Sequence, residues 1–271
     1  MTISRISTAF AKLKSAGHLA FMPFITAGDP DIAMTLGLIR ELGRQGVDLI
    51  EVGFPYSDPI ADGPVIQASY TRALNNKLRV DDIFNGVRSL PTSELPPLVA
   101  MVSFALIFRR GIATFVAQAA EAGFAGLIIP DLPADEADEV SAIAKSRGLD
   151  VVQLIAPTTP RERAVKILKA ASGFVYCISI AGTTGVREDL PAELTEQLKW
   201  LRTQTDLPLA VGFGISKPEQ VDHLRAVADG VIVGSAIVRQ MASVGPTKTA
   251  EQAISAVGQI AAGLVAATHR A

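Results

Sequence analysis

The sequence predicts an α/β protein in which eight parallel strands close into a barrel. Short apolar runs alternate along the 271 residues with segments that have helical periodicity. The runs are apolar almost throughout, which is typical of a parallel sheet covered by helices. The eight runs occupy residues 19–28, 47–55, 97–105, 124–131, 149–157, 173–180, 207–215 and 229–237.

A closed barrel is favoured over an open doubly wound sheet. The first run ends in Thr-Ala-Gly-Asp-Pro (26–30) and lacks the Gly-x-Gly-x-x-Gly turn of dinucleotide-binding sheets. No linker or break in composition divides the chain, so residues 1–271 are expected to form a single (β/α)8 TIM barrel domain. Residues 3–14 precede the first strand with helical spacing, and we expect an extra N-terminal helix that closes the bottom of the barrel.

Composition and charge narrow the functional classes. The formal net charge is −2 with an apolar content of 49%, which does not favour nucleic acid as a partner. The lone Cys177 cannot form an intrachain disulfide. Residues 1–14 lack the apolar core of a signal peptide, and the apolar stretch 254–268 is shorter than a membrane span. A cytoplasmic location is therefore expected.

The second run carries the strongest candidate for catalysis. Alternation places Leu49, Glu51 and Gly53 on one face, and because helices cover the other face, Glu51 is expected to point into the barrel. The following loop, residues 54–64, contains Asp58 and Asp62, which with Glu51 could form an acid/base set. A buried structural Glu paired with an Arg, and ordinary turn chemistry for the aspartates, are the alternatives.

Small residues gather at the ends of the last three runs, in residues 181–185, 212–216 and 233–237. Glycine lets backbone amides approach an anion closely, and barrels commonly bind phosphate in the loops after their last strands. The candidate phosphate ligands are Gly185, Gly214, Gly234 and Ser235.

Two common catalytic arrangements are not indicated. None of His18, His223 and His269 clusters with acids at the end of a run, so no metal site is expected. No lysine lies within the eight runs, which argues against a Schiff-base aldolase.

The chain contains, in order, the motifs PFITAGDP (23–30), LIEVGFPYSDPIADGPVIQ (49–67), LIIPDLP (127–133), APTTP (156–160), GFGIS (212–216) and VGSAI (233–237). Through these motifs the sequence resembles the alpha chain of tryptophan synthase, from about residue 3 to residue 240. The resemblance implies a lyase of tryptophan biosynthesis that cleaves indole-3-glycerol phosphate to indole and glyceraldehyde 3-phosphate without a metal or organic cofactor. It also implies a PLP-dependent beta chain as partner in an alpha2beta2 heterotetramer.

The resemblance assigns roles to individual residues. The two catalytic carboxylates of the family fall on Glu51 and Asp62. A neutral Glu51 would protonate the indole ring and then accept a proton from the glycerol chain, while an ionised Asp62 would accept the indole N–H. The pKa values of the two carboxyl groups should therefore be pushed apart. The remaining substrate contacts fall on Phe24, Tyr176, Thr184, Gly185, Gly214, Gly234 and Ser235.

Two segments depart from the family pattern. Ser103 and Ala105 stand where the family usually has tyrosine and asparagine, and residues 179–185 lack its arginine and valine. One alternative is a stand-alone indole-glycerol-phosphate lyase that needs no beta chain. The other is a catalytically silent, phosphate-binding partner subunit, against which the retention of Glu51 and Asp62 argues. We expect residues 54–64 and 184–190 to close over substrate and to sense the beta chain.

Overall fold

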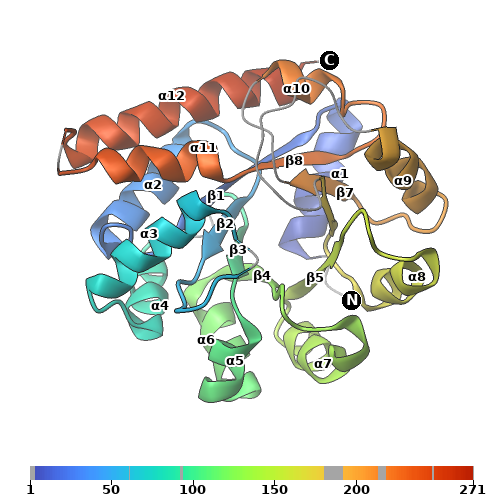
Figure 1. Ribbon diagram of the computed structural model, residues 1–271, viewed down its shortest axis with the longest axis horizontal. Coiled ribbons are helices and arrows are strands. Elements are labelled where there is room, and N and C mark those ends of the chain that lie inside the picture. The colour runs from blue at the N-terminus through green and yellow to red at the C-terminus, as the bar shows by residue number, and fades with distance from the viewer. Residues whose placement is uncertain are drawn as a thin grey trace.

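Eight parallel strands close into a barrel in the part of the chain that the computed structural model describes, residues 4–60, 62–91, 94–179, 192–212, 218–245 and 247–270 (Figure 1). Each strand pairs with its neighbours in chain order, and β8 returns to β1, which confirms the predicted fold class. The strands are β1 (Ala20–Thr26), β2 (Ile50–Gly53), β3 (Leu98–Met101), β4 (Phe124–Ile128), β5 (Asp150–Ile155), β6 (Val175–Ile178), β7 (Leu209–Gly212) and β8 (Gly230–Val233).

Helices surround this barrel on its outside (Figure 1). Local signals fix their ends: the side chain of Asp31 accepts from the Met34 amide at the start of α2, and Thr249 with Gln252 forms a capping box on α12. The helices are α1 (Arg5–Ala16), α2 (Ile32–Arg44), α3 (Pro64–Asn75), α4 (Val80–Arg88), α5 (Phe104–Arg110), α6 (Ile112–Ala122), α7 (Asp138–Ser146), α8 (Arg161–Ala170), α9 (Ala192–Arg202), α10 (Glu219–Asp222), α11 (Ser235–Val238) and α12 (Ala250–Thr268), with 3-10 turns η1 (Ala134–Glu136) and η2 (Arg239–Ser243).

Two of the predicted runs extend beyond their strands into helices. The third run includes the start of α5, because Ser103 caps that helix by accepting from the Ala105 amide. The eighth run includes α11, which begins directly after Gly234. Apolar character alone does not separate a short buried helix from a buried strand, so the sequence misplaced both ends.

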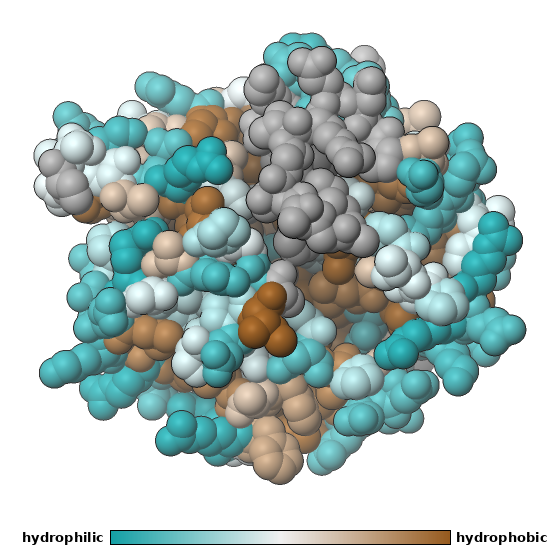
Figure 2. All heavy atoms as spheres, in the orientation of Figure 1, coloured by the Kyte–Doolittle hydropathy of each residue, from teal (hydrophilic) through white to brown (hydrophobic). Residues whose placement is uncertain are grey.

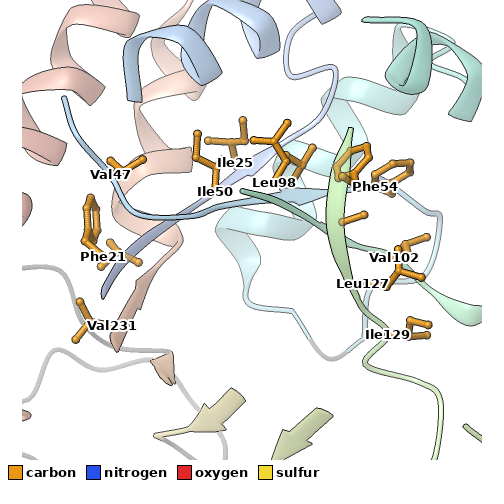
Figure 3. Packing of buried hydrophobic residues seen from close by; sticks show 14 of the residues in the cluster. Phe21, Ile25, Val47, Ile50, Phe54, Leu98, Val102, Leu127, Ile129 and Val231 are labelled. Carbon is orange, nitrogen blue, oxygen red and sulfur yellow. The ribbon is translucent and has the colours of Figure 1, made fainter. Parts of the chain in front are cut away.

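Alternation along the strands separates an outer core cluster from an inner one, and a third, small cluster around Phe24 and Tyr70 lies apart from both. Outward side chains such as Ile25, Ile50 and Leu98, from three neighbouring strands, point to the same side toward the helices (Figure 3). The inward set forms a separate cluster that includes Leu49, while Ile50 and Val52 belong to the outer one. This division confirms that the face carrying Leu49 and Glu51 is the inner face of β2.

The N-terminal helix closes one end of the barrel, as the sequence predicts. Its apolar stripe of Ile6, Phe10 and Leu13 joins the inner cluster. The Phe10 ring lies 5.7 Å, centroid to centroid, from that of Phe174, which directly precedes β6. Because α1 packs against residues at the beginnings of strands, it seals the N-terminal end of the barrel and leaves the opposite end for the site.

The last helix, α12, is long and apolar enough to cross a membrane by length and composition. It lies beside α2 along the outside of the barrel (Figure 1). Its buried residues, among them Val257, Ala261 and Leu264, belong to the outer core cluster. Helices that pack on the core of a protein meet the same length and hydropathy test.

Candidate active site

Glu51 lies at the centre of the candidate site. It pairs in register with Phe24 of β1 and Val99 of β3, and its exposed fraction is 0%. Neither carboxylate oxygen has a hydrogen-bond partner among the described residues, so the alternative of a structural Glu–Arg pair finds no support there. Burial without a partner raises the pKa of Glu51 to about 8. The carboxyl group is therefore mostly protonated at neutral pH.

Glycines at the ends of two strands make room for aromatic side chains beyond Glu51. A methyl group in place of the Gly53 hydrogen would lie 2.7 Å from Cε2 of Phe24 and 2.9 Å from the Tyr70 hydroxyl oxygen. At Gly212, such a group would lie 2.6 Å from Cζ of Tyr176. These contacts place three aromatic side chains against the carboxyl ends of β2 and β7.

Asp62 stands at the opening of the barrel, just before the N-cap residue of α3. It is half-buried, and burial raises its pKa to about 6. The adjacent N-terminus of α3 carries partial positive charge, which favours the ionised form and opposes this rise. Gln67 holds the loop by donating from Nε2 to the carbonyl oxygens of Asp62 (2.8 Å) and Pro59 (3.2 Å). At pH 7, Asp62 is mostly ionised while Glu51 is mostly protonated.

Helix α3 is tied to the end of β1 by side-chain bonds. The hydroxyls of Thr26 and Ser69 lie 2.7 Å apart. Arg72 donates to both oxygens of the fully buried Asp29, at 2.8 and 2.7 Å. Sequence reasoning missed these residues and also Tyr70, although the spacing of Ile66, Ser69 and Tyr70 on one helical face was a usable signal.

Comparisons with known proteins identify the family to which the chain belongs. The family described as "Tryptophan synthase alpha chain" matches residues 10–268. The chain belongs to this family. The alpha chain of Rhodopirellula baltica is 47% identical over 88% of this chain and 86% of its own length. That of Synechocystis is 43% identical over 91% and 94%, respectively.

Solved structures show the same relationship. The tryptophan synthase alpha chain of Legionella pneumophila matches with a TM-score of 0.86 and 35% identity, covering 98% of both chains. A structure of tryptophan synthase from Mycobacterium tuberculosis matches with a TM-score of 0.89 and 31% identity, covering all of both chains. Membership of the tryptophan synthase alpha chain family makes this chain a lyase of tryptophan biosynthesis that cleaves indole-3-glycerol phosphate.

Two substrate-contact residues expected from the resemblance lie near Glu51. Phe24 and Tyr176 are both buried, on β1 and β6. Burial raises the pKa of Tyr176 well above its ordinary value, with smaller contributions from Glu51 and then Asp62. The phenol therefore stays protonated and can donate a hydrogen bond.

The expected phosphate end is described in part. Gly234 directly follows β8 and is the N-cap residue of α11, and Ser235 begins α11 with an exposed side chain. A Cβ at Gly234 would lie 3.6 Å from that of Phe24, so these candidates share the mouth with an expected indole contact. The other expected contacts, Thr184, Gly185 and Gly214, lie outside the described residues.

The family departure at Ser103 has a structural consequence. The Ser103 hydroxyl donates to Asp131 Oδ2 at 2.6 Å, and the Phe104 amide donates to Oδ1 at 2.7 Å. These bonds connect the end of β3 to the loop after β4, where Asp131 belongs to a family-like motif. The serine thus joins two neighbouring strand ends at the mouth while it caps α5.

Proposed function

We propose that Glu51 and Asp62 together catalyse the retro-aldol cleavage of indole-3-glycerol phosphate. Neutral Glu51 delivers its proton to C3 of the indole ring, and the positive charge that develops on the ring nitrogen is stabilised by ionised Asp62. The Glu51 carboxylate then takes the proton of the glycerol hydroxyl as the bond between the ring and the chain breaks. The bonding electrons return to the ring, indole and glyceraldehyde 3-phosphate form, and Glu51 is again protonated.

The observation that carries this proposal is the fully buried carboxyl group of Glu51, which has no hydrogen-bond partner among the described residues and lies below the aromatic side chains at the mouth of the barrel. An acid that must also act as a base works best with a pKa near the working pH, and burial raises the pKa of Glu51 to about 8. The ordering of the two pKa values, about 8 for Glu51 and about 6 for Asp62, fits the required protonation states.

Substrate binding completes the proposal. Phe24 and Tyr176 contact the indole end of the substrate, Gly234 and Ser235 bind its phosphate, and the family resemblance adds Thr184, Gly185 and Gly214. The contact between Phe24 and Gly234 supports one continuous site that reaches from the ring to the phosphate.

The partner of the chain is the tryptophan synthase beta chain, and we propose an alpha2beta2 assembly. Ile60 and Phe108 are 91% and 70% exposed, which is unusual for large apolar residues. They lie after β2 and β3, on the same end of the barrel as Asp62. Figure 2 shows hydrophobic side chains among hydrophilic ones on the face it views. We propose that Ile60 and Phe108 form part of the surface that receives the beta chain.

We also propose that residues 1–271 form one domain and that the enzyme is cytoplasmic. Both terminal helices, α1 and α12, pack on the barrel core and not on a second body. The location is supported by the family of metabolic enzymes to which the chain belongs.

Release of indole from indole-3-glycerol phosphate, measured with and without the beta chain, tests the function. Replacing Glu51 with Gln should abolish release but preserve binding of glycerol phosphate, while the exposed Glu121→Gln should be active. Turnover by the Glu51→Gln variant would refute the role of Glu51. Full activity without a beta chain would favour the stand-alone lyase, and no indole from the wild-type complex would favour a silent subunit.

A further inference from the structure

Tyr70 is a buried tyrosine at the mouth of the barrel that the proposed mechanism does not use. It lies on α3 one turn after Ile66, and both pack in a cluster with Phe24. Side chains on a helix lean toward its N-terminus, which for α3 is the end beside Asp62. In agreement, the Tyr70 ring lies 5.7 Å, centroid to centroid, from that of Tyr56 in the loop before α3. Tyr70 thus points back along the helix toward the loop that carries Asp62.

The helix around Tyr70 is anchored on both sides of this residue. Ser69, directly before it, forms a hydrogen bond with Thr26. Arg72, two positions after it, donates two hydrogen bonds to Asp29. A paired guanidinium and carboxylate with two parallel hydrogen bonds has a defined geometry. The backbone of Tyr70 is therefore fixed relative to the end of β1, and its ring has little freedom with an exposed fraction of 1%.

The hydroxyl of Tyr70 lies against the end of β2, two residues beyond Glu51. It would be 2.9 Å from a Cβ at Gly53, which stands two residues beyond Glu51 on the inner face of β2. Within the described ranges, no residue forms a hydrogen bond with this hydroxyl. The ring is buried, but the hydroxyl oxygen is not among the fully enclosed polar atoms that lack a partner, so it reaches the mouth of the site and is available for a group that functions there.

The charged and titratable groups around Tyr70 determine which acceptor its hydroxyl donates to. Burial raises its pKa well above the ordinary value, and negative charge at Asp62, then Tyr56, then Glu51 raises it further, so the phenol remains a donor. Tyr176 of β6 experiences the same two carboxyl groups, and Asp131 acts on Tyr56. Arg72 is engaged with Asp29. A hydrogen bond to an ionised acceptor is about twice as strong as one to a neutral acceptor, which favours Asp62 over protonated Glu51.

We propose that Tyr70 is a positioning residue that donates a hydrogen bond to the ionised carboxylate of Asp62 in the substrate complex. The bond aims that carboxylate at the indole N–H and keeps it charged. This inference rests on the proposed role of Asp62. Because a hydrogen bond to the charged form lowers the pKa of an acid, loss of the Tyr70 hydroxyl must raise the pKa of Asp62.

The test is the pH profile of kcat, at saturating substrate, for indole release by the complex with the beta chain, with Tyr70→Phe as the variant, because kcat reports the groups of the substrate complex. The ring stays and only the hydroxyl is removed. We expect kcat to fall about tenfold or more at pH 7, and its acid limb to move up by about one pH unit, because hydrogen bonds to charged groups contribute about 1.5–3 kcal/mol. The alkaline limb, assigned to Glu51, should not move.

The neighbouring Thr71→Val is the matched control, because it removes an exposed hydroxyl whose partner among the described residues is the backbone carbonyl of Gln67. It should leave both limbs and the rate unchanged. A Tyr70→Phe variant whose acid limb coincides with the wild type would overturn the inference, even if the rate fell uniformly, since that pattern indicates packing alone.

Two further measurements separate the possible failures. If the Asp62→Asn variant is active and its acid limb is unchanged, the proposed role of Asp62 is wrong. If Asp62→Asn is inactive but the Tyr70→Phe profile matches the wild type, only the role of Tyr70 is wrong. If Tyr70→Phe does not fold, 3-fluorotyrosine at position 70 gives a stronger donor of nearly the same shape. It should move the acid limb to lower pH, and an unmoved limb would count against the proposal.

Discussion

Replacing Glu51 with Gln should make the protein more stable while it abolishes catalysis. The wild-type carboxyl is fully buried, and none of the described residues stabilises its charged form. Glutamine has nearly the same shape as the protonated acid and leaves similar polar atoms unsatisfied, so the two cost about the same to bury. The stability of the variant differs from that of the wild type mainly because glutamine, unlike Glu51, has no ionised form that high pH would favour.

The expected size follows from proton linkage. Burial raises the pKa of Glu51 from 4.5 to about 8, so between these pH values the folded chain holds a proton that the unfolded chain has released. The free energy of unfolding then falls by about 1.4 kcal/mol per pH unit, and by about 5 kcal/mol in total. The stability is fully present below pH 4.5, declines as pH rises, and levels off above about pH 8.

Urea unfolding of both proteins between pH 5 and pH 9 measures this effect. The gain in unfolding free energy of Glu51→Gln over the wild type should grow by about 4 kcal/mol across that range. Contributions from Asp62 and the other buried acids are common to both proteins and cancel in the difference. Parallel stability curves, with a gap that changes by less than about 1 kcal/mol, would show that Glu51 is not a desolvated acid and would refute the reasoning.

Three other predictions concern activity, packing and assembly. The pH profile of turnover should be bell-shaped, with limbs near pH 6 from Asp62 and pH 8 from Glu51, and a wild-type profile that stays flat from pH 7 to pH 9 would contradict the assignment of the alkaline limb to Glu51. Arg72→Met should destabilise the fold by about 3 kcal/mol in urea unfolding because it leaves buried Asp29 unpaired, and adding Asp29→Asn should recover part of the loss. Phe108→Asp should weaken beta-chain binding at least tenfold by titration calorimetry but leave the melting temperature within a few degrees, and unchanged affinity would place the interface elsewhere.

Much of the site could be predicted from the sequence because side chains along a barrel strand alternate between its inner and outer faces. The alternation at Leu49 to Gly53 was enough to direct Glu51 inward, and the spacing of Ile6, Phe10 and Leu13 was enough to predict the closing helix. Asp62 was different. Its sequence context, Asp before Gly and Pro, suits a plain turn as well as an acid, and only the folded loop shows it half-buried beside α3.

The tertiary structure decided the contacts between segments that are distant along the chain. The bonds from Asp29 to Arg72 and from Ser103 to Asp131 join groups that no local pattern relates. Tyr70 could be assigned to a buried helical face, yet its approach to Gly53 depends on how α3 is tied to β1. Periodicity encodes which way a side chain points, but what it meets there, and therefore its pKa, is set by packing between elements. The sequence by itself determined the barrel, the inward glutamate and the family; the fold decided the environment that gives the carboxyl groups their different acidities.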